Sequence, residues 1–443
     1  MTPADLLVAG GPLLAMDNAG SFHADGAVAV AGGRIVAVGP RAEVVARVAA
    51  AETIDAAGKA ILPGFVNGHG HAGMILLRGL AEERPLSRWL AATVWPLMKN
   101  AGPEETYAGA RLACLEMIRG GITLFTDMWR DIAATARAAE ESGLRARLAF
   151  NMRDFSAPDR LEPEWEAGIE AATARRPTER LCYGLSPHSL YACSDALLRR
   201  AADAFRRTGC HLQIHLAETR AETEECRART GRSPAERLDE LGLLGPSTLI
   251  AHGVWLTDDD CRRVAAAGAA IAHNVSSNLK LGSGVAPLDR FAAAGVRVAL
   301  GTDSAASNNS LDPFREMKFA ALVQRAVHED PCRLAPGAVL AAATREGARA
   351  LGLGDETGSL EPGKRADLIL VDLDKPHLQP VHRLDADTLT ALLVFAATAA
   401  DVDTTIVEGR ALMRGRQVLT LDADEAAAAA TAASRRLLAR AGF

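Results

Sequence analysis

The sequence predicts a (β/α)8 barrel that carries a small β-sandwich domain built from both ends of the chain. Short apolar segments alternate with longer amphipathic ones eight times through the middle of the chain. This pattern is typical of a (β/α)8 barrel, with an open doubly wound sheet as the competing arrangement. Strand-like segments punctuated by glycine occur near both ends, and 443 residues suffice for two to three domains at about 150 residues each.

The segments near the two ends share a pattern of short strands separated by glycines. Gly10-Gly11 and Gly32-Gly33 lie between the early strands and supply hairpin turns. The predicted strands are residues 6–9, 27–30 and 34–38 early in the chain, and 366–371, 404–407 and 416–421 late in it. We therefore expect residues 1–60 and 358–421 to form the two parts of the sandwich, 61–357 the barrel, and 422–443 an alanine-rich C-terminal helix.

The middle of the chain contains the eight predicted barrel strands. They are residues 61–66, 122–126, 147–151, 182–186, 211–216, 248–251, 270–273 and 296–301. Helical patterns lie between them, at residues 104–119, 131–142, 194–207, 221–230 and 257–267, and a further alanine-rich helix is expected over 336–351.

Composition and charge exclude several classes of protein. The net charge is −6, whereas a nucleic-acid-binding protein normally carries a basic footprint. No apolar run approaches the roughly 18 residues of a membrane span, and the first residues lack the features of a signal peptide. The seven cysteines include no Cys-x-x-Cys pair. We expect a cytoplasmic protein that acts on a small molecule, with no nucleic-acid or membrane partner.

His69 and His71 directly follow the first predicted barrel strand. In an extended segment residues i and i+2 point the same way, so both imidazoles can meet one ion. The neighbouring glycines allow the backbone to approach a metal closely. A His-x-His pair alone is weak evidence, because polar loop histidines are common.

Ionisable residues also end other predicted strands. These residues are His188, His215, His252 and Asp303, with Glu218 three positions after His215. Polar groups at the carboxyl ends of barrel strands are typically catalytic, because the rest of each strand is committed to packing. Each residue taken singly is as well explained as a hydrogen-bonded core or cap residue, but the joint pattern favours a site.

Three imidazoles and one carboxylate suit Zn²⁺ or Fe²⁺ with one position open to water. The metal lowers the pKa of that water, and the reaction then needs one group to accept a proton and another to protonate the leaving atom. Asp303 and His252 suit the first task and Glu218 the second, while His188 can polarise or orient the substrate. This set of residues is typical of a hydrolase.

Together these residues resemble the amidohydrolase superfamily, in its deaminase/chlorohydrolase branch, and within it the 5′-methylthioadenosine/S-adenosylhomocysteine deaminases. The resemblance runs from Pro63 to the region of Asp367, nearly the whole chain. The matching motifs are Pro63 to His71 with Leu76-Leu77-Arg78-Gly79, His215 to Glu225, Leu244-Gly245-Pro246 with Ala251-His252, His273-Asn274 with Ser277 to Leu281, and Gly301-Thr302-Asp303 with Ala306 to Asn309.

The resemblance implies a metal, zinc or iron, bound by His69, His71, His215 and Asp303. It places Glu218, His252 and His188 around the substrate and also implies a homodimer. The implied reaction is metal-dependent hydrolytic deamination of an aminated N-heterocycle, such as S-adenosylhomocysteine or methylthioadenosine.

One residue departs from the family pattern. Those deaminases usually carry a glutamate two residues after a Trp-Pro pair, where it holds the ribose hydroxyls, but here Trp95-Pro96 is followed by Met98. A thioether cannot accept two strong hydrogen bonds as a carboxylate can. Deamination or dechlorination of a non-ribosyl ring, such as a triazine, pterin or pyrimidine, is therefore an alternative. Trp89 can cover a planar substrate or pack on the barrel rim, and Arg153 is a candidate for binding a substrate carboxylate.

Two further alternatives differ in class. A non-catalytic binding module on the same barrel would have lost one or more ligands, yet every ligand is present. An amide hydrolase with two metals often bridges them by a carboxylated lysine on a barrel strand. None of the eight predicted strands contains lysine, which favours one metal.

Overall fold

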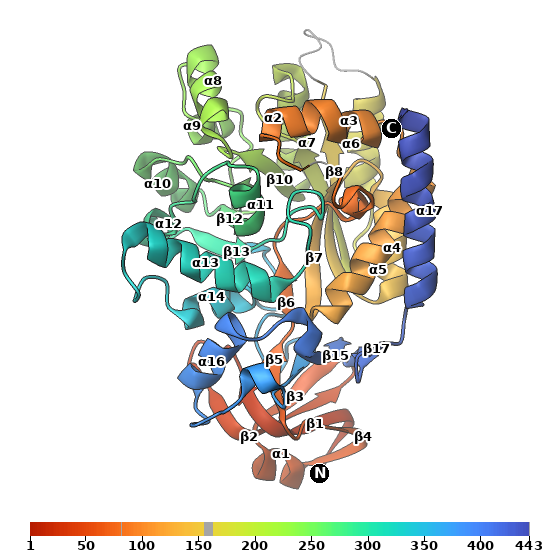
Figure 1. Cartoon of the computed structure of the whole chain (residues 1–443), viewed down its shortest axis with the longest axis vertical. Helices are drawn as coiled ribbons and strands as arrows, with labels where there is room; N and C mark the ends of the chain where they lie inside the picture. Colours follow the sequence, from red (N-terminus) through yellow and green to blue (C-terminus); the bar gives the residue numbers. More distant parts are fainter. Residues whose placement is uncertain (81, 155–162, 443) are drawn as a thin grey trace.

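The computed structural model describes residues 1–80, 82–154 and 163–442. Eight parallel strands form the nearly closed barrel that the sequence predicts (Figure 1). The first and last strands meet through a hydrogen bond from Gly68 N to Leu300 O at 2.7 Å. In spatial and chain order the strands are β6 (Phe65–Asn67), β7 (Ile122–Trp129), β8 (Arg145–Met152), β9 (Leu181–Pro187), β10 (His211–Leu216), β11 (Thr248–His252), β12 (Ala270–His273) and β13 (Arg297–Leu300).

Helices connect and surround the barrel strands. Those between β6 and β7 are η1 (Ala72–Leu77), α2 (Leu86–Trp89), the π-helix η2 (Leu90–Val94), α3 (Trp95–Met98) and α4 (Pro103–Arg119). The others are α5 (Ile132–Ser142), α6 (Pro163–Ala174), α7 (Asp195–Thr208), α8 (Arg220–Thr230), α9 (Pro234–Glu240), α10 (Asp258–Ala266), α11 (Val275–Lys280), α12 (Leu288–Ala294), α13 (Pro313–His328), α14 (Pro336–Ala342) and α15 (Arg345–Ala350).

The two ends of the chain build one mixed sheet of nine strands, at the bottom of Figure 1. Its strands are β1 (Thr2–Leu14), β2 (Phe22–Ala31), β3 (Arg34–Pro40), β4 (Val48–Asp55), β5 (Lys59–Pro63), β14 (Leu368–Asp372), β15 (Val402–Val407), β16 (Arg410–Arg414) and β17 (Gln417–Val418). The early and late strands meet where β5 pairs antiparallel with β14 over five residue pairs. The remaining helices are α1 (Arg41–Arg47), η3 (Pro376–Leu378), α16 (Ala386–Phe395), η4 (Ala399–Asp401) and α17 (Ala423–Ala441).

The strand predicted at residues 61–66 is in fact two strands. The chain leaves the mixed sheet after Pro63 and enters the barrel at Phe65. Gly64 makes this crossing possible, because a Cβ there would lie 2.1 Å from the hydroxyl oxygen of Thr123. Its N–H donates to the carbonyl oxygen of Asp367 on the late half of the mixed sheet, at 3.0 Å.

The helix predicted over 336–351 is broken into α14 and α15. The break follows from a contact with the barrel, because the carbonyl oxygen of Ala343 accepts a hydrogen bond from the N–H of Val66 in β6. Thr344 then adopts a non-helical conformation with φ −133° and ψ −102°. The second piece, α15, lies against β13 and β6.

One half of the barrel interior is apolar toward the amino-terminal ends of the strands. Side chains from β6, β7 and β11 to β13 pack there against the end of α15; they are Val66, Leu124, Leu249, Ala270, Ala272, Ala299, Ala348, Ala350 and Leu351. Bulky branched residues normally fill such a barrel, whereas five of these nine side chains are alanine.

The mixed sheet is attached to the barrel by a buried ion pair. Arg145 at the start of β8 donates from Nε to Asp367 Oδ2 at 3.0 Å and from Nη2 to Glu408 Oε1 at 3.1 Å. In the described part of the chain, no helix has the length and apolar character needed to cross a membrane.

Candidate active site and metal centre

The ionisable residues singled out in the sequence lie together at the carboxyl end of the barrel strands. His69 and His71 follow β6, and their neighbour across the barrel closure is Asp303, whose N–H donates to the carbonyl oxygen of His69 at 3.0 Å. His215 lies within β10, and His252 is the last residue of β11. Parallel strands of one barrel end at the same face, so residues far apart in sequence meet there.

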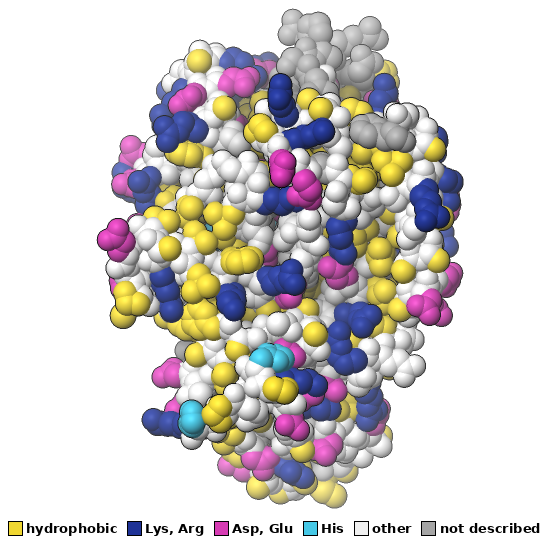
Figure 2. Space-filling view, in the orientation of Figure 1, with side chains coloured by type: hydrophobic (Ala, Val, Ile, Leu, Met, Phe, Trp, Pro, Cys, Tyr) yellow, Lys and Arg dark blue, Asp and Glu magenta, His cyan; other side chains and the backbone are white. Residues whose placement is uncertain are grey.

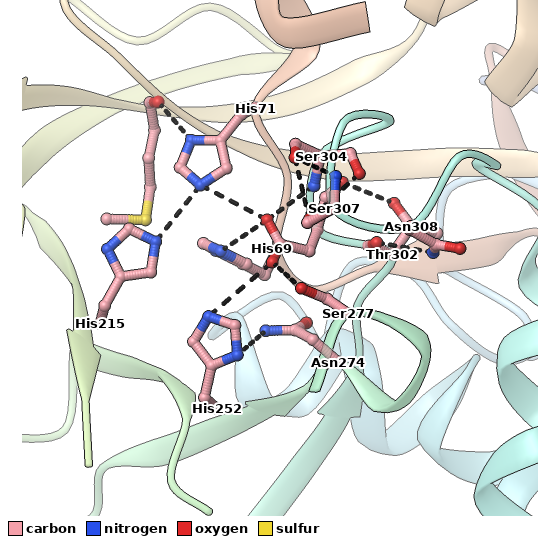
Figure 3. Close-up of polar contacts among 12 residues, drawn as sticks. His69, His71, His215, His252, Asn274, Ser277, Thr302, Ser304, Ser307 and Asn308 are labelled. Atoms are coloured by element: carbon pink, nitrogen blue, oxygen red, sulfur yellow. Dashed lines mark hydrogen bonds and ion pairs between the residues drawn. The ribbon is translucent and has the colours of Figure 1, made fainter. Parts of the chain in front are cut away.

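Four imidazoles and one carboxylate converge on one point (Figure 3). The Nε2 atoms of His71 and His215 are 3.2 Å apart. Asp303 Oδ1 lies 3.6 Å from His71 Nε2 and 3.7 Å from His69 Nε2. The ligand atoms of His69, His71 and Asp303 lie within 4.8 Å of one another, and so do those of His69, His215 and His252.

Hydrogen bonds on the outer side of the rings fix which nitrogen faces the centre. His71 Nδ1 donates to the carbonyl oxygen of Met128 at 2.9 Å, and His215 Nδ1 donates to that of His188 at 2.8 Å. Each ring therefore directs an Nε2 lone pair inward. A hydrogen bond from Nδ1 to a backbone carbonyl oxygen, with Nε2 left to bind the ion, is common for metal-bound histidine. Two lone pairs 3.2 Å apart repel each other unless a cation lies between them.

The ring nitrogens of His69 also indicate that a cation binds at the centre. Both of its ring nitrogens are buried, and neither has a hydrogen-bond partner among the described residues. A buried polar group without a partner is unfavourable and is rare in folded proteins. A divalent metal at the centre would satisfy the inward-facing nitrogens, so the donor set fits a transition metal such as zinc.

The electrostatics of the site favour the protonation states that bind metal. Burial, reinforced by the neighbouring His71 and His252, lowers the pKa of His215 to about 3. Burial alone would raise the pKa of Asp303, but the facing imidazoles and a hydrogen bond from Ser277 bring it below its usual value. Neutral imidazoles and an ionised carboxylate are the forms that metal ligands need.

Strained backbone points two of these side chains at the centre. Asp303 and His252 adopt the left-handed region, with φ +57° and +76°. Such conformations are unfavourable for residues with a Cβ and cluster at functional sites. Gly301 allows the loop before Asp303 to pass close by, because a Cβ there would lie 2.3 Å from Asn274 Oδ1.

His252 lies between the metal centre and Glu218. Its Nδ1 is 2.7 Å from Asn278 Oδ1 and 3.4 Å from Asn274 Nδ2, and the shorter contact makes Nδ1 the donor to Asn278. Its Nε2 lies 3.7 Å from Glu218 Oε2 and 3.9 Å from Asp303 Oδ2. His252 can therefore hydrogen-bond a group that is placed between the two carboxylates.

Glu218 is a buried carboxyl group beside the centre. It is 3% exposed, and its Oε1 accepts a long hydrogen bond of 3.4 Å from Ser283 Oγ. Burial, followed by the negative charge of Asp303, raises the pKa of Glu218 to about 8. A carboxyl group that titrates near neutral pH is suited to moving protons.

A cavity of about 930 Å³ opens onto these residues. His71, His188, His215, Glu218, His252 and Asp303 line its inner end. The remaining predicted substrate residues, Trp89, Met98 and Arg153, also line it, so all of them share one cavity. Trp89 on α2 additionally packs with Leu77 and Leu97 in an apolar cluster, which means that both of its predicted roles are compatible.

The outer part of the cavity carries aromatic and cationic groups. The Arg153 guanidinium carbon lies 5.6 Å from the centre of the Trp95 ring, and burial lowers the pKa of Arg153 to about 10. His188 is close to the metal centre, with its ring centre 4.5 Å from that of His215 and its Nδ1 3.2 Å from Ser189 Oγ.

Comparison with known proteins identifies the family. The Amidohydrolase family model matches residues 60–412, and an Imidazolonepropionase-like composite domain model matches residues 26–47. The chain is 41% identical, over 99% of its length and 100% of the relative's, to a 5-methylthioadenosine/S-adenosylhomocysteine deaminase of Pelotomaculum thermopropionicum. The chain belongs to the amidohydrolase family.

Two more relatives match this amidohydrolase over almost its whole length. A 5′-deoxyadenosine deaminase of Methanosarcina mazei is 39% identical, with 99% of each chain covered. The crystal structure of an adenosine deaminase from Xanthomonas campestris with bound zinc has a TM-score of 0.93 and 34% identity, with 99% of each chain covered.

Sequence reasoning missed several residues that support the site of this amidohydrolase. Asp127 Oδ1 accepts the N–H of Ala72 next to His71, and Glu222 accepts the N–H groups of Ala217 and Glu218. Asp127 lies within β7, one residue beyond the strand predicted at 122–126, so extending that prediction by one residue would have found it. Glu222 lies four residues after Glu218, and this spacing alone does not indicate a functional residue.

Proposed function

We propose that this amidohydrolase is a metal-dependent deaminase that replaces the exocyclic amine of an N-heterocycle by oxygen and releases ammonia. One observation carries the proposal: the inward-facing imidazoles and Asp303 lie beside Glu218, a buried carboxyl group with a raised pKa, at the inner end of a large cavity. The relatives named as deaminases of adenosine compounds support the same reaction.

The metal would be held by His69, His71, His215 and Asp303, and zinc is the proposed ion, with iron as the alternative. His252 also lies close enough to be considered, but its Nε2 faces Glu218 and Asp303, which favours a role in catalysis. When bound, the metal acts as a Lewis acid that lowers the pKa of water near the reacting carbon. The zinc in the Xanthomonas campestris relative supports this choice.

Three side chains would move or hold the protons. Asp303 and His252 Nε2 would accept hydrogen bonds from the attacking water and from the hydroxyl that forms at the ring carbon. Glu218 delivers its proton to the ring nitrogen, regains one from the attacking water and passes it to the departing amine, which leaves as ammonia. The hydroxyl on the ring carbon then returns a proton to Glu218 as the carbonyl group forms. Burial keeps the pKa of Glu218 near the working pH, and this is the condition for efficient transfer in both directions.

The proposed substrate is an adenosine derivative such as methylthioadenosine or S-adenosylhomocysteine. A cavity of about 930 Å³ is at the upper end of the range for small-molecule sites, which suits a nucleoside with a 5′ substituent. His188 would hydrogen-bond the substrate next to the metal centre, and Trp89 would contact it through an apolar surface. Arg153 would bind a substrate carboxylate, where one is present.

Met98 supports a second candidate, a non-ribosyl aminated or chlorinated ring. Its side chain is half-buried in the cavity wall and offers a polarisable apolar surface with no strong hydrogen-bond acceptor. A triazine, pterin or pyrimidine needs no acceptor for vicinal hydroxyls at this position.

A homodimer in the cytoplasm is the proposed assembly and location. Hydrophobic side chains gather over α13 in Figure 2, where Phe319, Leu322 and Val327 are 43%, 42% and 57% exposed. Exposed apolar groups that cluster in this way often mark a protein interface.

All seven cysteines are free thiols, which suits a reducing compartment. We also propose the domain bounds expected from the sequence. Residues 1–60 and 358–421 form the β-sandwich domain, 61–357 the barrel, and 422–443 the C-terminal helix.

The test is a deamination screen followed by ultraviolet absorbance. The panel contains adenosine, methylthioadenosine, S-adenosylhomocysteine, guanine, cytosine, pterins and melamine, and each reaction is also assayed for ammonia. We expect turnover of at least one compound, with adenosine derivatives preferred. Absence of ammonia with every compound, from enzyme that contains metal, would contradict the proposed reaction.

Metal content is measured on the same preparation. We expect about one equivalent of zinc or iron, and activity that a chelator removes and added Zn²⁺ or Fe²⁺ restores. Less than about half an equivalent that cannot be recovered by adding metal would count against the site.

A further inference from the structure

The polar half of the barrel interior contains groups that the deaminase site does not use. Arg147, His211 and Gln213 line a cavity of about 120 Å³ at the amino-terminal end of the strands. This cavity shares no lining residue with the large cavity at the opposite end. On β10, Gln213 is one inward-facing position below His215, and His211 is two such positions below it. The two sites are therefore separated by about the length of the strand.

Several polar atoms in this small cavity lack partners. His211 is 5% exposed and Gln213 is 2% exposed, yet His211 Nε2 and Gln213 Oε1 have no hydrogen-bond partner in the described part of the chain. Arg147 Nε is likewise buried without a partner. Buried polar atoms are nearly always satisfied in folded proteins, so this arrangement indicates that something else binds there.

The cavity also has an uncompensated positive charge. None of the described carboxylates forms an ion pair with Arg147, and burial lowers the pKa of its guanidinium group. Arg147 is half-buried, and an arginine that loses part of its hydration normally has an anionic partner, because desolvating an unpaired charge is unfavourable. The opposite half of the barrel interior is apolar and offers no partner.

Solvent can reach this cavity. Its lining includes Pro246 and Gly352, both exposed at the amino-terminal face of the barrel. Gly352 has φ +67°, and a Cβ at this position would lie 3.3 Å from Arg147 Nη1. The guanidinium group therefore extends to the mouth of the cavity, where an ion would arrive.

We propose that this cavity is a second binding site, for one small oxyanion of carboxylate or phosphate type. The Arg147 guanidinium would pair with the anion, and His211 Nε2, carrying a proton, would donate to it. A water molecule occupies about 30 Å³ of liquid, so 120 Å³ holds an acetate or phosphate ion with one or two waters. The fork of a guanidinium matches the geometry of both anions.

Binding is measured by calorimetry on the metal-loaded enzyme with sodium acetate and with sodium phosphate at low ionic strength. We expect saturable binding of at least one anion. In Arg147→Met this binding should weaken roughly tenfold or more, because charge-assisted hydrogen bonds are lost. The control Arg410→Met removes the same charge from an exposed strand position and should bind as the wild type does.

Two results would overturn the proposal. One is the absence of saturable binding of either anion to the wild type, and the other is binding that Arg147→Met leaves unchanged, which would place it at the metal centre or elsewhere. Should Arg147→Met fail to fold, crystals of the wild type in sodium selenate decide the question. An anomalous peak within hydrogen-bond distance of Arg147 is expected, whereas a cavity filled by water alone would refute the site.

Discussion

Replacing Glu218 by glutamine should separate catalysis from stability. Glutamine has nearly the same shape and can still accept the 3.4 Å hydrogen bond from Ser283, but it cannot exchange a proton. General acid–base groups contribute about 10²–10⁴-fold in rate, which corresponds to about 2.7–5.5 kcal/mol in the barrier. We therefore expect kcat to fall by that factor while the metal content is unchanged.

The same variant should be at least as stable as the wild type. The pKa of Glu218 is raised from 4.5 to about 8, so ionising the buried carboxyl group costs up to about 5 kcal/mol more than in water. A raised pKa means that the wild type loses stability as the pH increases from 4.5 to 8, and glutamine avoids this loss. The melting temperature of Glu218→Gln at pH 8 should therefore equal or exceed that of the wild type.

Both effects are measured together, by steady-state kinetics, metal analysis and thermal unfolding. Glu104→Gln changes an exposed carboxyl group and serves as the matched control. A Glu218→Gln enzyme with intact metal and near-normal kcat would remove Glu218 from proton transfer. A large drop in melting temperature would show instead that the carboxyl group serves the fold.

Three further outcomes are expected. His252→Asn should reduce kcat at least about tenfold while changing metal content little, because it loses the Nε2 that faces Glu218 and Asp303; parallel loss of metal would make His252 a ligand. Met98→Glu should raise kcat/KM for ribosyl substrates relative to the free heterocycle by roughly 10–150-fold, and an unchanged ratio would dismiss this position as the ribose contact. Burial raises the pKa of Glu316 to about 7 against its hydrogen bonds from Ser276 and Asn308. The wild type should therefore lose up to about 3 kcal/mol as pH rises from 4.5 to 7, so the melting temperature of Glu316→Gln relative to wild type should increase between pH 5 and pH 8; an equal difference at both values would refute this.

The barrel and its site were predictable because each strand has a simple signature. An apolar segment ending in an ionisable residue identifies both the strand and its contribution to the site, as for His215 on β10 and His252 on β11. The mixed sheet was predictable from the similar glycine-rich strands at both ends, since isolated strands need partners.

The parts that sequence reasoning missed depend on contacts between distant segments. The break between α14 and α15 follows from one hydrogen bond of Ala343 to Val66, which no local pattern records. The contacts that aim the site residues join Asp127 to Ala72 and Asn278 to His252, across 55 and 26 residues. Such side chains look like ordinary polar residues until the fold brings their partners together.

The pairing of β5 with β14 has a consequence for biosynthesis. About 300 residues separate the two strands in the chain, and a ribosome adds them in about 15–60 s at 5–20 residues per second. Throughout that time the early strands have an open edge that no later strand covers, and open edges invite pairing with other chains. The nascent protein therefore depends on the barrel or on a chaperone to keep this edge from neighbouring polypeptides until β14 arrives.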